Sequence, residues 1–116
     1  MNGQYAPLLE TLTRLRGIRG AMVVAVGDGL VVAESLMGGV KSATLAAMAA
    51  SVAAKAAELA GRAGYGAPRF LHLQASDGSL LVAPAGAELV LVAVAGRDVP
   101  LGLLRLEMLR MAERLA

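Results

Sequence analysis

The sequence predicts an α+β fold in which five antiparallel strands form one sheet and helices cover both of its faces. Short apolar runs are separated by tight turns, and two of these turns contain the Asp-Gly pair that is typical of β-hairpins. Two of the runs are apolar at every position, as in strands that are buried on both faces. Three stretches with helical periodicity flank and separate the runs, which gives the order α-β-β-α-β-β-β-α.

The N-terminal part predicts a short helix and a hairpin. The helix begins near Pro7, which suits a first helical turn, and its apolar spacing continues to Gly17. The residues over 21–26 are all apolar and predict a strand that is covered on both faces. Asp28-Gly29 then turns the chain into a second strand, "LVVAES", which the glycines of "LMGGVK" end.

A long alanine-rich helix is predicted over 42–62. Ser42 is a candidate N-cap, and "GRAGYGAP" ends the helix with three glycines and a proline. At about 100° per residue the helix has three faces. The face expected to lie on the sheet carries Leu45, Met48, Val52, Leu59 and Ala56. A narrow polar strip carries Thr44, Ser51, Lys55, Glu58 and Arg62, with Glu58 and Arg62 spaced to form an ion pair. The third face carries Ala43, Ala46, Ala47, Ala50, Ala53, Ala54, Ala57 and Gly61.

The C-terminal part predicts three more strands and a helix. "RFLHLQAS" alternates in the period of a strand, a turn over 76–79 leads into "LLVAP", and "ELVLVAVAG" follows a further turn. Asp98 is the expected N-cap of the last helix, with Pro100 just inside it. One buried stripe is expected on this helix, formed by Leu101, Leu104, Met108, Met111 and Leu115.

The composition fits a single domain over 1–116 that associates with a partner. The chain is 57% hydrophobic and 17% charged, with a mean hydropathy of +0.64, so few charges are available to cover a surface. We therefore expect apolar surface to be buried against another molecule. The absence of cysteine excludes disulfides and thiolate sites and agrees with a cytoplasmic protein.

Nucleic acid and membrane are not the expected partners. The formal net charge is only +2, the basic residues are scattered, and Tyr5, Tyr65 and Phe70 are too few for a base-stacking platform. The N-terminus lacks the order of a signal peptide. The alanine-rich run contains Lys55 and Glu58, and alanine contributes little to bilayer insertion, so no membrane span is expected.

The side chains that catalysis requires are sparse. His72 is the only histidine and is expected to be an ordinary residue of a strand, so no metal site is expected. Asp28, Asp77 and Asp98 each occupy a turn or a cap, where aspartate has a local role. "GGVKSAT" lacks the glycine directly before lysine that a phosphate-binding loop needs. No catalytic residue and no cofactor are expected, and the chain is not expected to be an enzyme.

The broad face of small residues has two interpretations. Small side chains let two helix backbones approach closely, which favours pairing of this helix with its copy around a twofold axis. Alanine is also the best helix former, and the chain is rich in alanine elsewhere, so composition alone is the alternative explanation. Self-pairing is the favoured interpretation.

Three segments in this order resemble the roadblock family, which includes roadblock-type dynein light chains and the bacterial gliding-motility protein B. They are "GIRGAMVVAVGDGLVVAES" after a short helix, "LLVAPAGAELVLVAVA" after the alanine-rich helix, and the closing "PLGLLRLEMLRMAERL". The resemblance implies a homodimer with the two long helices side by side and a continuous sheet formed through "RFLHLQAS". Phe70, His72 and Gln74 would then join the face of small residues in the dimer interface.

The resemblance also implies a function. Members of the family bind small Ras-like GTPases as regulators or scaffolds, so we expect a non-enzymatic homodimer that docks such a GTPase, with activation of GTP hydrolysis as one form of this regulation. The polar strip defined above is the expected docking site. A structural scaffold or adaptor that leaves nucleotide turnover unchanged is the alternative. A small-ligand sensor is a third hypothesis, although no polar cluster converges on a pocket in the sequence.

Overall fold

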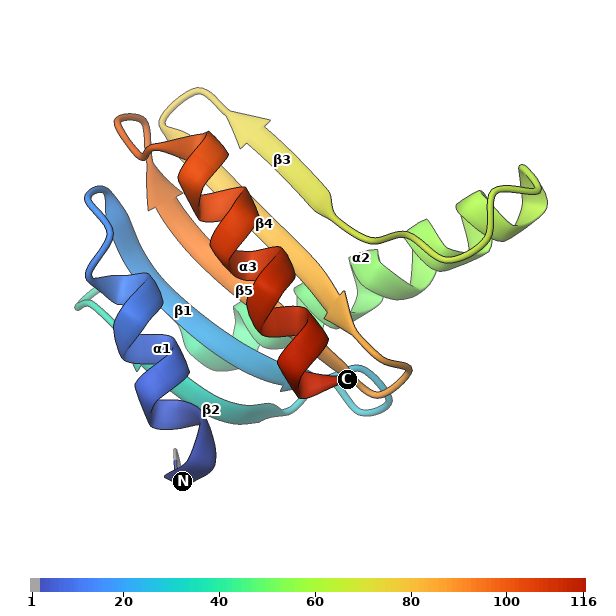
Figure 1. Ribbon diagram of the computed structural model, residues 1–116, viewed down its shortest axis with the longest axis horizontal. Helices are drawn as coiled ribbons and strands as arrows, with labels where there is room; N and C mark the ends of the chain where they lie inside the picture. Colours follow the sequence, from blue (N-terminus) through green and yellow to red (C-terminus); the bar gives the residue numbers. More distant parts are fainter. Residues whose placement is uncertain (1–2) are drawn as a thin grey trace.

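The computed structural model describes residues 3–116 and confirms the predicted fold (Figure 1). Five antiparallel strands form one sheet, and three α-helices occur in the order α-β-β-α-β-β-β-α within the described residues. The helices are α1 (Ala6–Thr13), α2 (Ser42–Arg62) and α3 (Leu101–Leu115), with a 3-10 turn, η1 (Gly3–Tyr5), before α1. The strands are β1 (Ile18–Ala25), β2 (Val31–Leu36), β3 (Leu71–Ala75), β4 (Gly78–Ala85) and β5 (Leu89–Gly96).

The two strands that are apolar on both faces lie at the centre of the sheet. The strand order is β2-β1-β5-β4-β3, so β2 and β3 are the edges. β1 pairs with β5 from Ile18 to Ala25 and with β2 through pairs such as Ala21 with Ser35. A bulge at Val32 shifts the register of β2 near its start. The central position of β1 and β5 explains why both faces of these strands need cover.

The helices form two unequal layers, as Figure 1 shows. α1 and α3 cover one face with large side chains that are fully buried, among them Leu9, Leu12, Leu104 and Met108. α2 covers the other face with buried alanines only. On that side the strands supply the large side chains: Met22, Val24, Val90 and Val92. The layer under α2 is therefore filled from the sheet.

The face of α2 that lies on the sheet is not the one predicted. Ala46, Ala50 and Ala53 are buried there, whereas Met48 and Leu59 are 61% and 72% exposed. Val52 is also exposed, and Leu45 and Ala56 are half-buried. The prediction was wrong because it assumed that the largest apolar residues of the helix pack on the sheet. Bulky strand residues already fill this layer, so the helix fits only through its small face.

Two predicted caps are corrected as well. α2 begins at Ser42, and its N-cap is Lys41, which makes no side-chain capping hydrogen bond. Pro100 is the N-cap of α3, and it has no side-chain capping bond either, so Asp98 does not cap this helix. Asp98 instead lies beside Gly17 and Gly96, where the start of β1 meets the end of β5. The predicted stripe of α3 is confirmed: Leu104, Met108 and Met111 are buried, and Leu101 and Leu115 are partly buried against the same core.

Gly17 joins α1 to the sheet at a point where no side chain fits. It has φ +86°, and a Cβ added there would lie 2.9 Å from the backbone nitrogen and Cα of Val99. Its carbonyl accepts a hydrogen bond from the backbone N–H of Gly96 at 2.7 Å, which fixes the two segments together. Gly39 has nearly the same φ, +90°, but nothing within 4 Å of the corresponding Cβ position.

We expect Gly17→Ala to lower the free energy of unfolding by about 2–4 kcal/mol, from backbone strain and steric overlap together. Gly39→Ala provides a matched control, since it carries the strain without the overlap and is expected to cost about 1 kcal/mol. Urea denaturation followed by circular dichroism measures both values. Equal losses in the two variants would contradict the close packing of Gly17 against Val99.

Candidate protein-interaction site

The second half of α2 extends beyond the sheet that the first half covers. Figure 1 shows the helix passing the β3 edge and ending well outside the sheet. Ala57 lies on the same face of the helix as Ala46, Ala50 and Ala53, yet it is exposed. The helix face that contacts the sheet therefore continues past the edge without any strand of this chain beneath it.

An apolar groove runs between α2 and the β3 side of the sheet. Its cavity has a volume of about 160 Å³, and its lining is almost entirely apolar. From α2 it is lined by Leu45, Met48, Ala49 and Val52, and from the strands by Leu71, Leu73, Leu80, Val82 and Val92. Leu59 continues the same flank of the helix beyond the sheet. Together these residues form an apolar surface that this chain does not cover, which is the usual mark of an interface.

β3 borders this groove as a free edge strand. It pairs only with β4, and four of its five residues are exposed. Its Leu71 and Leu73 lie on the α2 side and line the groove, whereas His72 lies on the α3 side. There the His72 Nε2 is 2.9 Å from the hydroxyl oxygen of Ser79 on β4. The predicted edge strand is thus confirmed as an edge.

The other predicted interface residues near β3 lie in different surroundings. Gln74 is exposed on the same side as His72. Phe70 precedes the strand, packs against the core beneath α3 and has the Arg105 guanidinium 5.5 Å from its ring centre. Phe70 is therefore held mainly by its own chain.

The structure divides the predicted face of small residues. Ala46, Ala50 and Ala53, which were predicted for an interface with a second chain, are buried against the sheet of the same chain, and almost none of their surface is left for a partner. The remaining members are exposed: Ala43, Ala47, Ala54, Ala57 and Gly61. Leu71, Leu73 and Leu80 line the groove but were not predicted as interface residues. The alternation in "RFLHLQAS" places Leu71 and Leu73 on one side of the strand. It does not indicate whether that side is covered by the rest of the chain or left open.

The predicted polar strip lies together on the outward face of α2. All five residues are exposed: Thr44, Ser51, Lys55, Glu58 and Arg62. Glu58 is close to both neighbouring cations, with 3.7 Å to the Lys55 Nζ and 3.5 Å to the Arg62 Nε. The expected pair of Glu58 with Arg62 is confirmed. Because such exposed pairs contribute little to stability, these charges are free to serve binding.

α2 is the one helix within residues 3–116 that is long and apolar enough to cross a membrane, a test of length and composition only. Its mean hydropathy is 1.3, and 17% of the apolar window is buried in the chain. A helix that meets a partner through one flank passes the same test. The outward charges of Lys55, Glu58 and Arg62 favour a protein partner over lipid.

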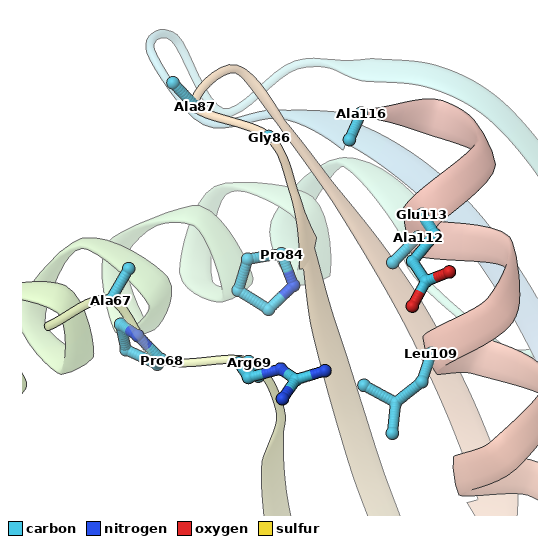
Figure 2. A pocket seen from close by; sticks show the side chains of 10 residues that line it. All are labelled: Ala67, Pro68, Arg69, Pro84, Gly86, Ala87, Leu109, Ala112, Glu113 and Ala116. Carbon is cyan, nitrogen blue, oxygen red and sulfur yellow. The ribbon is translucent and has the colours of Figure 1, made fainter.

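The hollow in Figure 2 is one candidate for a small-molecule site. It has a volume of about 460 Å³ and lies between the end of α3, the β4–β5 turn and the segment before β3. The side chains of Arg69 and Glu113 border it from opposite sides, and its other lining residues are apolar or glycine. One cation and one anion offer few contacts to orient a ligand. Elsewhere in the described chain, no three His, Asp or Glu side chains gather to hold a metal ion.

Comparison with known proteins places the chain in a family. The sequence profile of the Roadblock/LC7 domain matches residues 6–95. Two uncharacterized proteins of Methanocaldococcus jannaschii are 38% and 37% identical to the chain over 108 residues, which are 93% of this chain and 92% of each relative.

Solved structures agree with the fold. The Roadblock/LC7 domain of Streptomyces avermitilis has a TM-score of 0.83 at 23% identity, and the match covers 92% of this chain and 90% of that one. The gliding protein MglB of Thermus thermophilus has a TM-score of 0.83 at 30% identity, covering 95% and 84%. A structure of MglB with a tetrameric arrangement gives 0.83 at 32% identity, covering 95% and 83%. The profile match and the curated relatives show that this chain belongs to the Roadblock/LC7 domain family.

Proposed function

We propose that the chain functions as a homodimer whose two copies meet at the groove between α2 and β3. The exposed groove and the overhanging half of α2 carry this proposal. A copy placed around a twofold axis beside β3 would bring its own overhanging helix over the open sheet of the first chain. The contact is then reciprocal, since each chain offers the surface that the other lacks.

In this arrangement the apolar flank of α2 forms the helix–helix seam. Met48, Val52 and Leu59 lie on that flank and face the groove side. The two β3 edges would pair in an antiparallel manner and so satisfy backbone groups that water now solvates. The small residues beyond the sheet, Ala57 and Gly61, would let α2 lie close to the partner's strands, as Ala46 and Ala50 do within the chain.

We expect Val52→Glu to raise the dissociation constant of the dimer at least ~100-fold, because it buries a charge in the apolar seam. Val52 is exposed in the single chain, so the monomer is expected to stay folded. Ala54→Glu is the matched control, since it places the same charge two residues away on the opposite, exposed flank. Light scattering should give twice the 11.8 kDa chain mass for the wild type and the control. At about 10 µM, well below the range in which a weaker contact would act, a dimeric Val52→Glu variant would contradict the seam.

The dimer is proposed to regulate or dock a small Ras-like GTPase. Membership of the Roadblock/LC7 family and the likeness to the gliding protein MglB support a regulatory or adaptor role of this kind. Neither the polar strip nor the hollow in Figure 2 suggests a nucleotide site in the chain itself. The chain would therefore act on the bound GTPase from outside its nucleotide pocket.

The polar strip of α2 is the proposed docking site. In the dimer both strips would face outward on the same side of the extended sheet, next to the helix seam. Phosphoryl transfer depends mainly on positioning and on charge stabilisation. A rigid platform that holds the switch segments of the GTPase would therefore raise the hydrolysis rate without an inserted catalytic residue.

The double substitution Lys55→Ala with Glu58→Ala is expected to weaken binding of a Ras-like GTPase from the same organism at least ~10-fold, which corresponds to the loss of about one charged contact. The GTPase is loaded with a non-hydrolysable GTP analogue, and calorimetry measures the affinity. Glu10→Ala with Arg14→Ala removes a comparable exposed pair of 3.8 Å at the end of α1 and serves as the control. Both variants should remain dimers with unchanged unfolding temperatures.

Two results would change this assignment. Unchanged affinity in the α2 variant would remove the docking site from the polar strip. Normal binding by the wild type without any change in the rate of GTP hydrolysis or nucleotide exchange would favour the scaffold or adaptor function instead.

A further inference from the structure

The free edge at β2 remains when the other edge of the sheet is used for dimerisation. β2 pairs with β1 alone, and α1 and α2 cover its two faces. Backbone N–H and C=O groups alternate between the two sides of an antiparallel strand. Half of those in β2 therefore point away from β1, towards a side on which the described chain has no strand. The proposed dimer, built through β3, would carry one such edge at each end.

The composition of β2 does not protect this edge strongly. Natural edge strands often carry lysine, proline or strong bulges that prevent pairing with another chain. Over Val31–Leu36 the sequence is "VVAESL", with no lysine, arginine or proline, and the bulge at Val32 lies near one end. Over 33–36 the pairing of β2 with β1 is regular, and no bulge distorts this part of the strand.

Two large apolar residues mark the ends of the edge. Leu30 precedes β2 and Met37 follows it, and each is 63% exposed. The backbone hydrogen bonds that close the strand hold both residues in place: the N–H of Ala25 donates to the Leu30 carbonyl, and the N–H of Met37 donates to the Arg19 carbonyl, each at 2.9 Å. Neither side chain belongs to the core clusters.

We propose that β2 is a second self-association edge, through which dimers join by antiparallel pairing of β2 with β2 of another copy. In that pairing Leu30 of one chain approaches Met37 of the other at both ends of the interface, so the contact is self-complementary. Unpaired strand backbone selects an extended strand as its occupant. A second copy supplies such a strand, and the tetrameric arrangement of MglB, at 32% identity, agrees with association beyond the dimer.

The contact between two β2 edges is weak, and it allows further dimers to be added. The edge is only six residues long, so the pairing forms few backbone hydrogen bonds. Each added dimer presents a new β2 edge, so growth proceeds in steps of two chains. The twist that accumulates along a widening sheet limits its length.

The test compares two double variants by light scattering between about 10 µM and 1 mM, the range that suits a weak contact. Leu30→Lys with Met37→Lys places charges at both ends of the β2 edge. Leu103→Lys with Leu106→Lys makes the same change in charge at two exposed positions of α3 and is the control. We expect the wild type and the control to grow from dimers to tetramers with concentration. The β2 variant should need at least ~10-fold more protein to do so.

Hydrogen exchange locates the contact. Backbone amides over 31–36 should exchange more slowly in concentrated wild-type protein than in dilute protein, whereas the β2 variant should show no such difference. In the Val52→Glu background, which blocks the α2–β3 seam, the same edge should convert monomers into dimers. Because this variant tests the β2 contact without the α2–β3 seam, its result does not depend on whether the dimer proposed above forms.

Three results would overturn the proposal. The wild type could remain dimeric at about 1 mM, which would leave the edge to an extended segment of another protein. The two double variants could associate equally well, or the amides over 31–36 could exchange at the same rate at all concentrations.

Discussion

The close approach of α2 to the sheet is the constraint on which the rest of the molecule depends. Met22, Val24 and Val92 rise from the central strands and fill the space beneath the helix. Only alanines fit above them, so the backbone of α2 settles near the strands. The larger apolar residues of α2 are consequently turned to its flank. The apolar groove and the exposed apolar flank of α2 both follow from this packing of alanines on the sheet.

The opposite layer shows the more usual solution. Leu9 and Leu12 of α1 and Leu104 and Met108 of α3 pack there against strand residues that are both small, such as Ala93, and large, such as Leu91. The helices therefore supply large side chains to this layer, whereas α2 buries only alanines in the other. The face under α1 and α3 has a core that this chain buries. The face under α2 is buried only over the central strands and stays open beside β3.

The sequence predicted the elements well because their signals are local. Asp28-Gly29 marks the first hairpin, and the apolar runs of β1 and β5 identify the central strands. Caps were less predictable: Asp98 has the right residue type for an N-cap, yet contacts near Gly17 and Gly96 determine its place. Local residue preference therefore identifies several possible cap residues, and tertiary contacts determine which of them caps the helix.

The candidate site was predicted only in part for a related reason. Helical periodicity correctly separated the faces of α2 and gathered the polar strip around Lys55 and Glu58. It could not assign the faces, because which one meets the sheet depends on the size of side chains from distant strands. Leu71 and Leu73 were likewise recognised as one side of a strand, but the opening beside them exists only in three dimensions.

The overhang of α2 has a consequence for the order of the docking surface. Lys55, Glu58 and Arg62 all lie on the half of the helix that has no sheet of its own beneath it. Helices of this length without tertiary support fray readily in water. In the proposed dimer, a second chain covering this half would remove conformational entropy from it before a partner binds. Dimer assembly and binding at the polar strip would then be thermodynamically linked, each raising the affinity of the other with no change in the folded shape.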